Sequence, residues 1–217
     1  LREQMGLNDP LPVQYFRFIR GAVTGDLGTS VRLRSPVIDL IADRLGSTLA
    51  LSLGGILFAI VIGMSAGILA ALRQGTWIDT LSMFLAYLGV SMPLFWLGLL
   101  LILVFSFQLG WFPPAGQEGL RSLVLPSLSL GLISAGIIAR LTRASLVEVL
   151  VEDYMRTARA KGLPKRIIYF RHALRNAFLP ILTILGLQFG AMLAGAVVTE
   201  TVFSRPGLGR LVVSAIL

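Results

Sequence analysis

Long runs of uncharged, mostly apolar residues alternate with short polar stretches along this chain. The uncharged runs cover residues 45–72, 80–117, 123–139 and 176–199. A helix needs about 20 apolar residues to cross the hydrocarbon core of a membrane, and each run, with the helical turns that flank the third, provides them. The pattern predicts spanning helices at about residues 47–72, 80–109, 123–147 and 176–199. We therefore expect an all-α fold, a polytopic membrane helical bundle.

The first 46 residues are more polar than the rest. They contain six basic and five acidic residues, so no part of them is expected to span. Apolar residues nevertheless recur there at helical spacing, and Pro36 opens a second short amphipathic piece. The first set comprises Val13, Phe16, Ile19 and Val23. Such pieces lie on a membrane surface or pack against the bundle. We divide the chain into an amphipathic extracytoplasmic segment, residues 1–46, and a transmembrane domain, residues 47–217.

The second run contains a helix-breaking residue near its middle. Pro93 follows Ser91 and Met92, and a proline inside a span frees a backbone carbonyl that needs a partner within protein or water. Two interpretations are open: these three residues border a solute path, or the break is a packing kink.

Small residues recur at four-residue intervals in three of the predicted spans. They give each span a smooth face that lets another helix approach closely. They are Gly63 and Gly67 in the first span, Gly131, Ala135 and Ala139 in the third, and Gly186, Gly190 and Ala194 in the fourth. We expect the fourth span to pack against the third.

Between the third and fourth spans lies an elbow, residues 148–175. From Arg140 to Arg175 the chain has nine Lys and Arg residues against three acids. Good helix formers lead up to Gly162, which suits a left-handed helix cap, and Pro164 suits the start of a new helix. The sequence predicts a helix, a sharp corner and a second, amphipathic helix.

The charges predict the orientation in the membrane. Because the elbow is the most basic part of the chain beside the spans, we expect it to be cytoplasmic, together with the turn at 73–79. Residues 1–46, the turn at 110–122 and the segment from Glu200 then face outward. Arg140 and Arg143, at the end of the third span, are expected near lipid headgroups; arginines along an ion pathway are the alternative.

Several chemistries have no support in the sequence. The chain lacks cysteine and has one histidine, His172, so it offers no thiolate or histidine cluster for a metal and no catalytic triad. It has no Gly-rich phosphate loop, and we expect no cofactor in this chain and no enzyme activity. Its pI near 11 comes from residues that flank apolar spans. We therefore expect contact with membrane lipid and no nucleic acid.

Three segments carry a resemblance to a known family. DYMRTARAKGL, HALRNAFLP and ETVFSRPGLGRL resemble the permease subunits of bacterial ABC importers for dipeptides, oligopeptides, glutathione or nickel, which are type I importers with an EAA loop. Ala158 and Gly162 match the EAA pattern, whereas Arg156 and Thr157 replace its first residues and the following proline is delayed to Pro180.

The resemblance implies a type I permease fold in the bacterial inner membrane, with a further span before residue 1 and another after residue 217. It implies a second permease subunit, two ATPase subunits that bind ATP and Mg, and an extracytoplasmic substrate-binding protein. It also implies that the elbow is a coupling element that touches the ATPase. The residues expected there are Asp153, Thr157, Ala158, Arg159, Lys161, Gly162 and Leu163.

We therefore predict a transmembrane permease subunit of an ATP-driven solute importer. It would form half of a translocation pathway and couple to a separate ATPase through residues 152–175. A self-sufficient channel or ion-coupled carrier is the alternative; it would need acids deep in the spans, where the sequence has none. A membrane-embedded enzyme would lack a nucleophile. Peptide, glutathione, opine and nickel systems share the motifs, and we expect small peptides.

Overall fold

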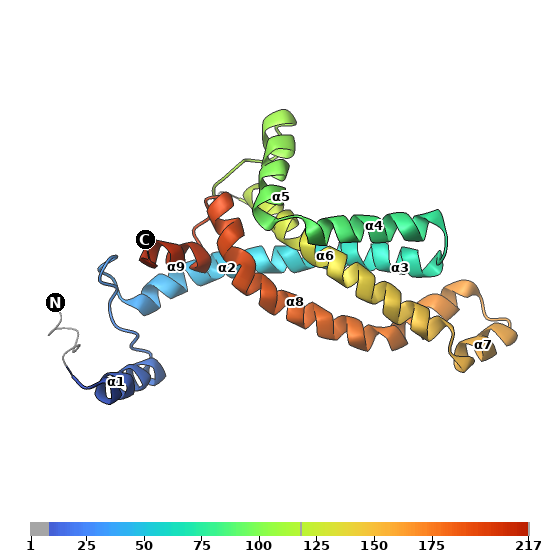
Figure 1. Ribbon diagram of the computed structural model, residues 1–217, viewed down its shortest axis with the longest axis horizontal. Coiled ribbons are helices and arrows are strands. Elements are labelled where there is room, and N and C mark those ends of the chain that lie inside the picture. Colours follow the sequence, from blue (N-terminus) through green and yellow to red (C-terminus); the bar gives the residue numbers. More distant parts are fainter. Residues whose placement is uncertain (1–8, 118, 217) are drawn as a thin grey trace.

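The computed structural model describes residues 9–117 and 119–216, and the elements among them are helices with one isolated bridge, Thr29 to Pro36. Figure 1 shows an elongated bundle with α7 at one end and α1 at the other. The first span is one continuous helix of 36 residues made of α2 (Val37–Ala59), a π-helical segment η1 (Ile60–Met64) and α3 (Ser65–Leu72). It begins ten residues before the predicted span because nothing after Pro36 breaks the helix.

The second apolar run forms two helices instead of one. α4 (Trp77–Ser91) is followed by α5 (Leu94–Leu101) and the π-helical η2 (Ile102–Gln108), and the two parts are bent by 106°. Met92 takes an extended conformation with ψ 133°, as expected of a residue before proline. The predicted break at Pro93 is therefore present. However, the expected continuous helix over 80–109 is replaced by two helices that meet nearly at a right angle (Figure 1).

The central helix is α6 (Arg121–Leu150), which packs against α2, α3, α4 and α8. In the most apolar 18-residue stretch of α6, 67% is buried within this chain. The corresponding share is 33% in the first span and 17% in the last. The last span joins the π-helical η3 (Ile167–Ala173) to α8 (Leu174–Val202), again over 36 residues. The second helix of the elbow is thus the start of the last span, because no breaker separates them.

Close helix approaches occur at glycines, as the small-residue pattern predicts. A Cβ atom on Gly63 would lie 2.6 Å from the Ala135 carbonyl oxygen, and one on Gly67 would lie 2.5 Å from that of Ala139. α8 does pack against α6, as predicted, but the small residues of α8 do not lie at this contact. Gly186 and Gly190 are exposed and a Cβ on either would meet nothing within 4 Å.

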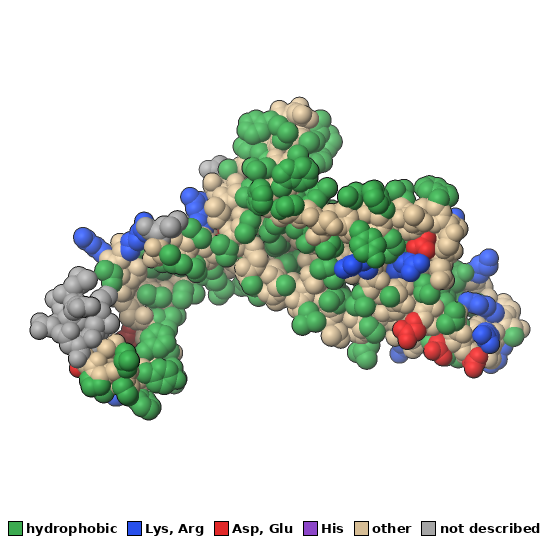
Figure 2. Space-filling model, in the orientation of Figure 1, with side chains coloured by type: hydrophobic (Ala, Val, Ile, Leu, Met, Phe, Trp, Pro, Cys, Tyr) green, Lys and Arg blue, Asp and Glu red, His purple; other side chains and the backbone are tan. Residues whose placement is uncertain are grey.

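The two ends of the described chain differ in how they contact the bundle. α1 (Leu11–Thr24) has no buried residue, so the packing against the bundle considered above is not observed. α9 (Leu208–Ile216) follows a tight turn after α8 and contacts α8 and α2. Charged side chains gather towards the end of the molecule that carries α7, whereas green apolar side chains cover much of the rest (Figure 2).

Candidate functional site

The elbow begins with α7 (Asp153–Ala160), whose sequence suits a short helix. Glu152 is extended, with ψ 150°, and its carbonyl accepts the Met155 and Arg156 amides. Asp153 lies in the first turn and Arg159 in the last. Each charge opposes the helix dipole at its end, which stabilises so short a helix.

The corner after α7 is a glycine cap of the Schellman type. Gly162 has φ +71°; its amide donates to the Arg159 carbonyl at 3.0 Å, and the Leu163 amide donates to the Ala158 carbonyl at 3.4 Å. The next helix starts at once, since the Pro164 carbonyl accepts the amides of Ile167 and Ile168. The left-handed cap predicted at Gly162 is confirmed.

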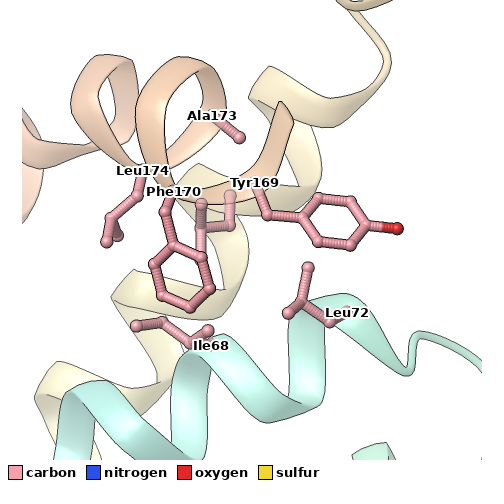
Figure 3. A pocket seen from close by; sticks show the side chains of 7 residues that line it. Ile68, Leu72, Tyr169, Phe170, Ala173 and Leu174 are labelled. Carbon is pink, nitrogen blue, oxygen red and sulfur yellow. The ribbon is translucent and has the colours of Figure 1, made fainter. Parts of the chain in front are cut away.

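The inner face of the elbow is apolar and is buried in a hydrophobic cluster shared with neighbouring helices. Met155 and Ala158 are buried in one cluster with Ala71 of α3, Leu146 of α6 and Ile168 of η3. Beside this cluster, the side chains of η3 and the start of α8 face those of α3 across a small apolar pocket (Figure 3). The residues that line this pocket are Ile68, Leu72, Leu146, Tyr169, Phe170, Ala173 and Leu174.

Polar contacts fix the elbow to the two long helices on either side of it. The Arg159 guanidinium donates to the Leu150 carbonyl at the end of α6, at 3.1 Å. Asn176 of α8 donates to the Tyr154 hydroxyl at 3.1 Å. α7 is thus hydrogen-bonded to the end of α6 and to α8, and its buried side chains belong to the same cluster as Ala71 of α3.

The outer face of the elbow carries most of the predicted coupling residues. Asp153, Thr157, Arg159, Lys161 and Gly162 are exposed, and Leu163 is half-buried. Ala158 is the exception, because it is 8% exposed and belongs to the inner cluster. Its side chain therefore supports the elbow from within instead of offering a surface. The remaining face is short, polar and mixed in charge.

The helix break lies beside a cavity. A cavity of about 530 Å³ opens between η1 and α3, α4 and α6, and Met92 lines it. Its walls are mainly apolar, with Ser65 and Ser82 as the hydroxyl groups among the lining residues. Ser91 and Pro93 are exposed beside Met92 without lining the cavity. The break therefore positions one of the three predicted path residues on the cavity wall.

An ion pair that the sequence did not reveal joins α4 to α6. Arg143 donates from Nε to Asp79 Oδ1 at 2.6 Å and from Nη2 to Oδ2 at 2.7 Å. Nearby, the Arg140 guanidinium lies 5.1 Å from the centre of the Tyr87 ring. Both arginines, expected at lipid headgroups, thus contact α4. Their partners are 64 and 53 positions away in the chain, so no local pattern could have identified them.

A second polar network holds the other end of the bundle. The Glu200 carboxylate is fully buried; it accepts from Thr48 Oγ1 at 2.6 Å and from the Arg210 amide at 3.0 Å. Gly207 is required there, because a Cβ atom would collide with this carboxylate. Arg205 donates to the carbonyls of Gly116 and Ser122, each at 3.3 Å.

Arg205 has a lower pKa than a solvent-exposed arginine. Its burial lowers the pKa of the guanidinium, and the Glu200 carboxylate partly offsets this effect. The sequence of this segment, ETVFSRPGLGRL, predicts a turn on the outer side of the membrane but does not indicate its contacts with other helices. The structure shows that it ties α8, α9, α2 and the turn before α6 together.

Among residues 9–117 and 119–216, no group of three or more His, Cys, Asp or Glu side chains is placed to hold a metal ion. The outer face of the elbow and the cavity at the break are the two features that coincide with residues predicted from the sequence to be functional.

Comparison with known proteins agrees with this geometry. A family model described as "binding-protein-dependent transport system inner membrane component" matches residues 59–217. The glutathione transport system permease protein GsiC of Escherichia coli is 50% identical over 216 residues, which cover all of this chain and 71% of that protein. GsiC of Shigella flexneri is 49% identical over 216 residues, which again cover all of this chain and 71% of that protein.

A solved structure shares the fold at lower sequence identity. It is described as an amino acid ABC transporter with histidines, and it aligns with a TM-score of 0.56 and 18% identity. The alignment covers 82% of this chain and 86% of the solved chain. At that identity the likeness concerns the fold alone.

Proposed function

We infer the function of this chain from its family: it belongs to the binding-protein-dependent transport system inner membrane components, and it is a permease subunit of an ABC importer. Its apolar helices make it a multi-pass protein of the inner membrane. The expected type of fold is confirmed. Within this function we propose how the chain couples to ATP, where the solute passes and what the solute is.

We propose that the elbow is the element through which a separate ATPase subunit acts. The observation that carries this proposal is the two-sided character of α7. Met155 and Ala158 are buried in a cluster formed with residues of α3, α6 and η3, while Asp153, Thr157, Arg159 and Lys161 remain exposed. A short helix that is rigidly seated on the bundle and polar on its outer face suits a docking element. Leu163 and Gly162 set the direction of the chain beyond it.

The proposed assembly contains a second permease, two ATPases that bind ATP and Mg, and an external substrate-binding protein. The exposed stripe of Gly186, Gly190 and Ala194 on α8 supports a membrane partner, since small residues let another helix approach closely. ATP hydrolysis would occur in the ATPase subunits, and this chain would need no cofactor. The helices around the cavity at Met92 would contribute one half of the solute path.

We propose small peptides as the solute class, with glutathione as the first candidate. The support is the 50% identity to glutathione permeases over the full chain. Glutathione is itself a tripeptide, so it agrees with the expectation of small peptides drawn from the motifs. The cavity walls are mainly apolar and carry no charged group that would select one peptide.

The test uses the complete importer in lipid vesicles, with its receptor protein outside and ATP inside. Labelled glutathione, a dipeptide and Ni²⁺ are offered in turn, and uptake is followed with and without hydrolysable ATP. Uptake of glutathione or of the dipeptide that requires ATP and the receptor supports the proposal. Uptake that continues without ATPase subunits would instead favour a channel or ion-coupled carrier, and uptake of Ni²⁺ alone would contradict the peptide assignment.

A further inference from the structure

The ion pair between Asp79 and Arg143 is built as a rigid clamp. Two parallel hydrogen bonds of 2.6 and 2.7 Å join the guanidinium to both carboxylate oxygens, an arrangement that fixes orientation as well as distance. Asp79 is 5% exposed, so water does not compete for it as it does at surface pairs. The two residues therefore hold α4 and α6 in one relative position.

The Asp79 end of the clamp is anchored in the turn between α3 and α4. Asp79 Oδ2 also accepts the amide of Gly75 at 3.0 Å, and Gly75 has φ +76°. Asp79 lies in the first turn of α4, where the helix dipole favours a carboxylate. A displacement of Arg143 would thus be passed to the whole turn and to the start of α4.

The Arg143 end of the clamp is continuous with the elbow. Seven residues of helix separate Arg143 from Leu150, about 10 Å at the rise of an α-helix. Leu150 accepts the hydrogen bond from Arg159 of α7, and Leu146 is buried in the same cluster as Met155. These two links would pass a displacement of α7 to the last turns of α6 and hence to Arg143.

The other end of α4 is the helix break. α4 runs without interruption from the clamp to Ser91, and Met92 lines the cavity. We propose that Asp79 and Arg143 are positioning residues that make α4 follow α6, so that a displacement of the elbow reaches the break at Met92 and Pro93. This inference rests on the proposed role of the elbow in coupling. The Asp79 carboxylate is buried and Arg143 is half-buried, and net stabilisation alone explains such a pair poorly, since an ion pair withdrawn from water is often no more stabilising than apolar residues of the same volume.

The test compares solute uptake with ATP hydrolysis in the complete reconstituted importer. Arg143→Lys keeps the charge but loses the two-pronged geometry, and Asp79→Asn keeps the shape but loses the charge. For both we expect normal membrane abundance, normal ATPase copurification and receptor-stimulated hydrolysis, with uptake per ATP lower by at least about fivefold, the lower end of typical coupling between sites. Asp79→Arg combined with Arg143→Asp should recover part of the ratio.

Arg17→Gln provides the control, because it breaks an ion pair with Asp9 that is exposed on both sides, and it should leave the ratio unchanged. Parent ratios in Arg143→Lys and Asp79→Asn would overturn the inference. So would a proportional loss of hydrolysis and uptake, or poor accumulation of both variants, because each indicates a role in folding alone. A parent importer that shows no ATP-dependent uptake would contradict the proposed function itself.

Discussion

Thr48 of α2 and Glu200 of α8 are hydrogen-bonded at 2.6 Å although 152 positions separate them in the chain. The same Thr48 hydroxyl accepts the amide of Leu208 at 2.9 Å, and the Glu200 carboxylate accepts the amide of Arg210. Together the two side chains satisfy two free amides at the start of α9, which a helix cannot satisfy internally. One threonine and one glutamate thus decide where α9 lies.

Thr48→Val should lower the stability of the bundle. The change keeps the shape of the side chain but leaves a buried carboxylate oxygen and the Leu208 amide with one partner fewer, a loss of about 1–3 kcal/mol. In a chain of this size each kcal/mol corresponds to roughly 2–4 °C in Tm, measurable by thermal unfolding in detergent. Thr201→Val is the control, since Thr201 is exposed and bonds its own helix. Equal Tm values for the two variants would contradict the role of Thr48.

Gly67→Ala should also destabilise the chain, for a different reason. Its new methyl group would lie 2.5 Å from the Ala139 carbonyl oxygen, so α3 and α6 would have to separate, at a cost of about 1–3 kcal/mol. Gly186→Ala is matched to it, because a Cβ there meets nothing within 4 Å. We expect a lower Tm for the first variant and an unchanged or higher one for the second. The reverse order would mean that the close approach is misassigned.

Gly162→Val should separate assembly from coupling. Nothing lies within 4 Å of a Cβ at this position, so its cost is the left-handed backbone, about 1–2 kcal/mol for a residue with a side chain. We expect normal membrane abundance, weaker copurification of the ATPase and loss of receptor-stimulated hydrolysis and transport. Gly162→Asn is the control, because asparagine tolerates this conformation. Stimulation near the parent level in Gly162→Val would refute the role of the elbow.

Ser91→Trp should reduce uptake while the complex still assembles. Ser91 is exposed and is followed by Met92, which lines the cavity. An indole at position 91 would obstruct a solute path beside Met92. Phe107→Trp, at an exposed position on η2, offers a comparison in which the added bulk lies away from the cavity. Transport assays in vesicles measure both. Undiminished uptake in Ser91→Trp would place this residue against lipid or inert packing.

The orientation of the chain in the membrane can be determined with impermeant thiol reagents. The chain has no cysteine of its own, so that a single introduced cysteine is the labelled site. We expect Gln117→Cys to be labelled in intact cells, since Gln117 is exposed in the turn before α6. Lys165→Cys, exposed in the elbow, should be labelled only after the membrane is opened. Labelling of Lys165→Cys alone in intact cells would invert the predicted topology.

Features specified by neighbouring residues were predictable from the sequence. Gly162 followed by Pro164 marks a corner through backbone preferences, and Pro93 marks a break for the same reason. The bounds of the first span were harder to predict, because hydropathy reports where lipid contact starts and not where the helix starts at Val37. Likewise the start of the last span was hidden by its arginines, although the helix runs on from η3.

Features that depend on distant partners were not predictable. The sequence around Arg143 predicts a contact with lipid headgroups, whereas the structure pairs Arg143 with Asp79. The sequence around Glu200 predicts the start of an outward-facing segment, whereas the structure buries Glu200 beside Thr48. In the elbow, the family pattern indicated Ala158, but the pattern does not say which face of a helix is buried. The seven coupling residues therefore divide into five exposed residues, the half-buried Leu163 and the buried Ala158. Tertiary packing makes that division.

The central position of α6 affects how the chain enters the membrane during synthesis. α6 is the least apolar of the three long spanning helices, with a mean hydropathy of 1.9 against 2.4 and 2.1. Five of its serines are buried against protein: Ser122, Ser127, Ser129, Ser134 and Ser145. Alone in lipid, Ser127 and Ser134 would lack the partners that α2 and α8 provide, the Leu51 carbonyl and the Gln188 side chain. We therefore expect α6 to enter the membrane beside α2, α3 and α4, which precede it in the chain and pack against it, and a nascent chain without these helices to insert α6 less efficiently.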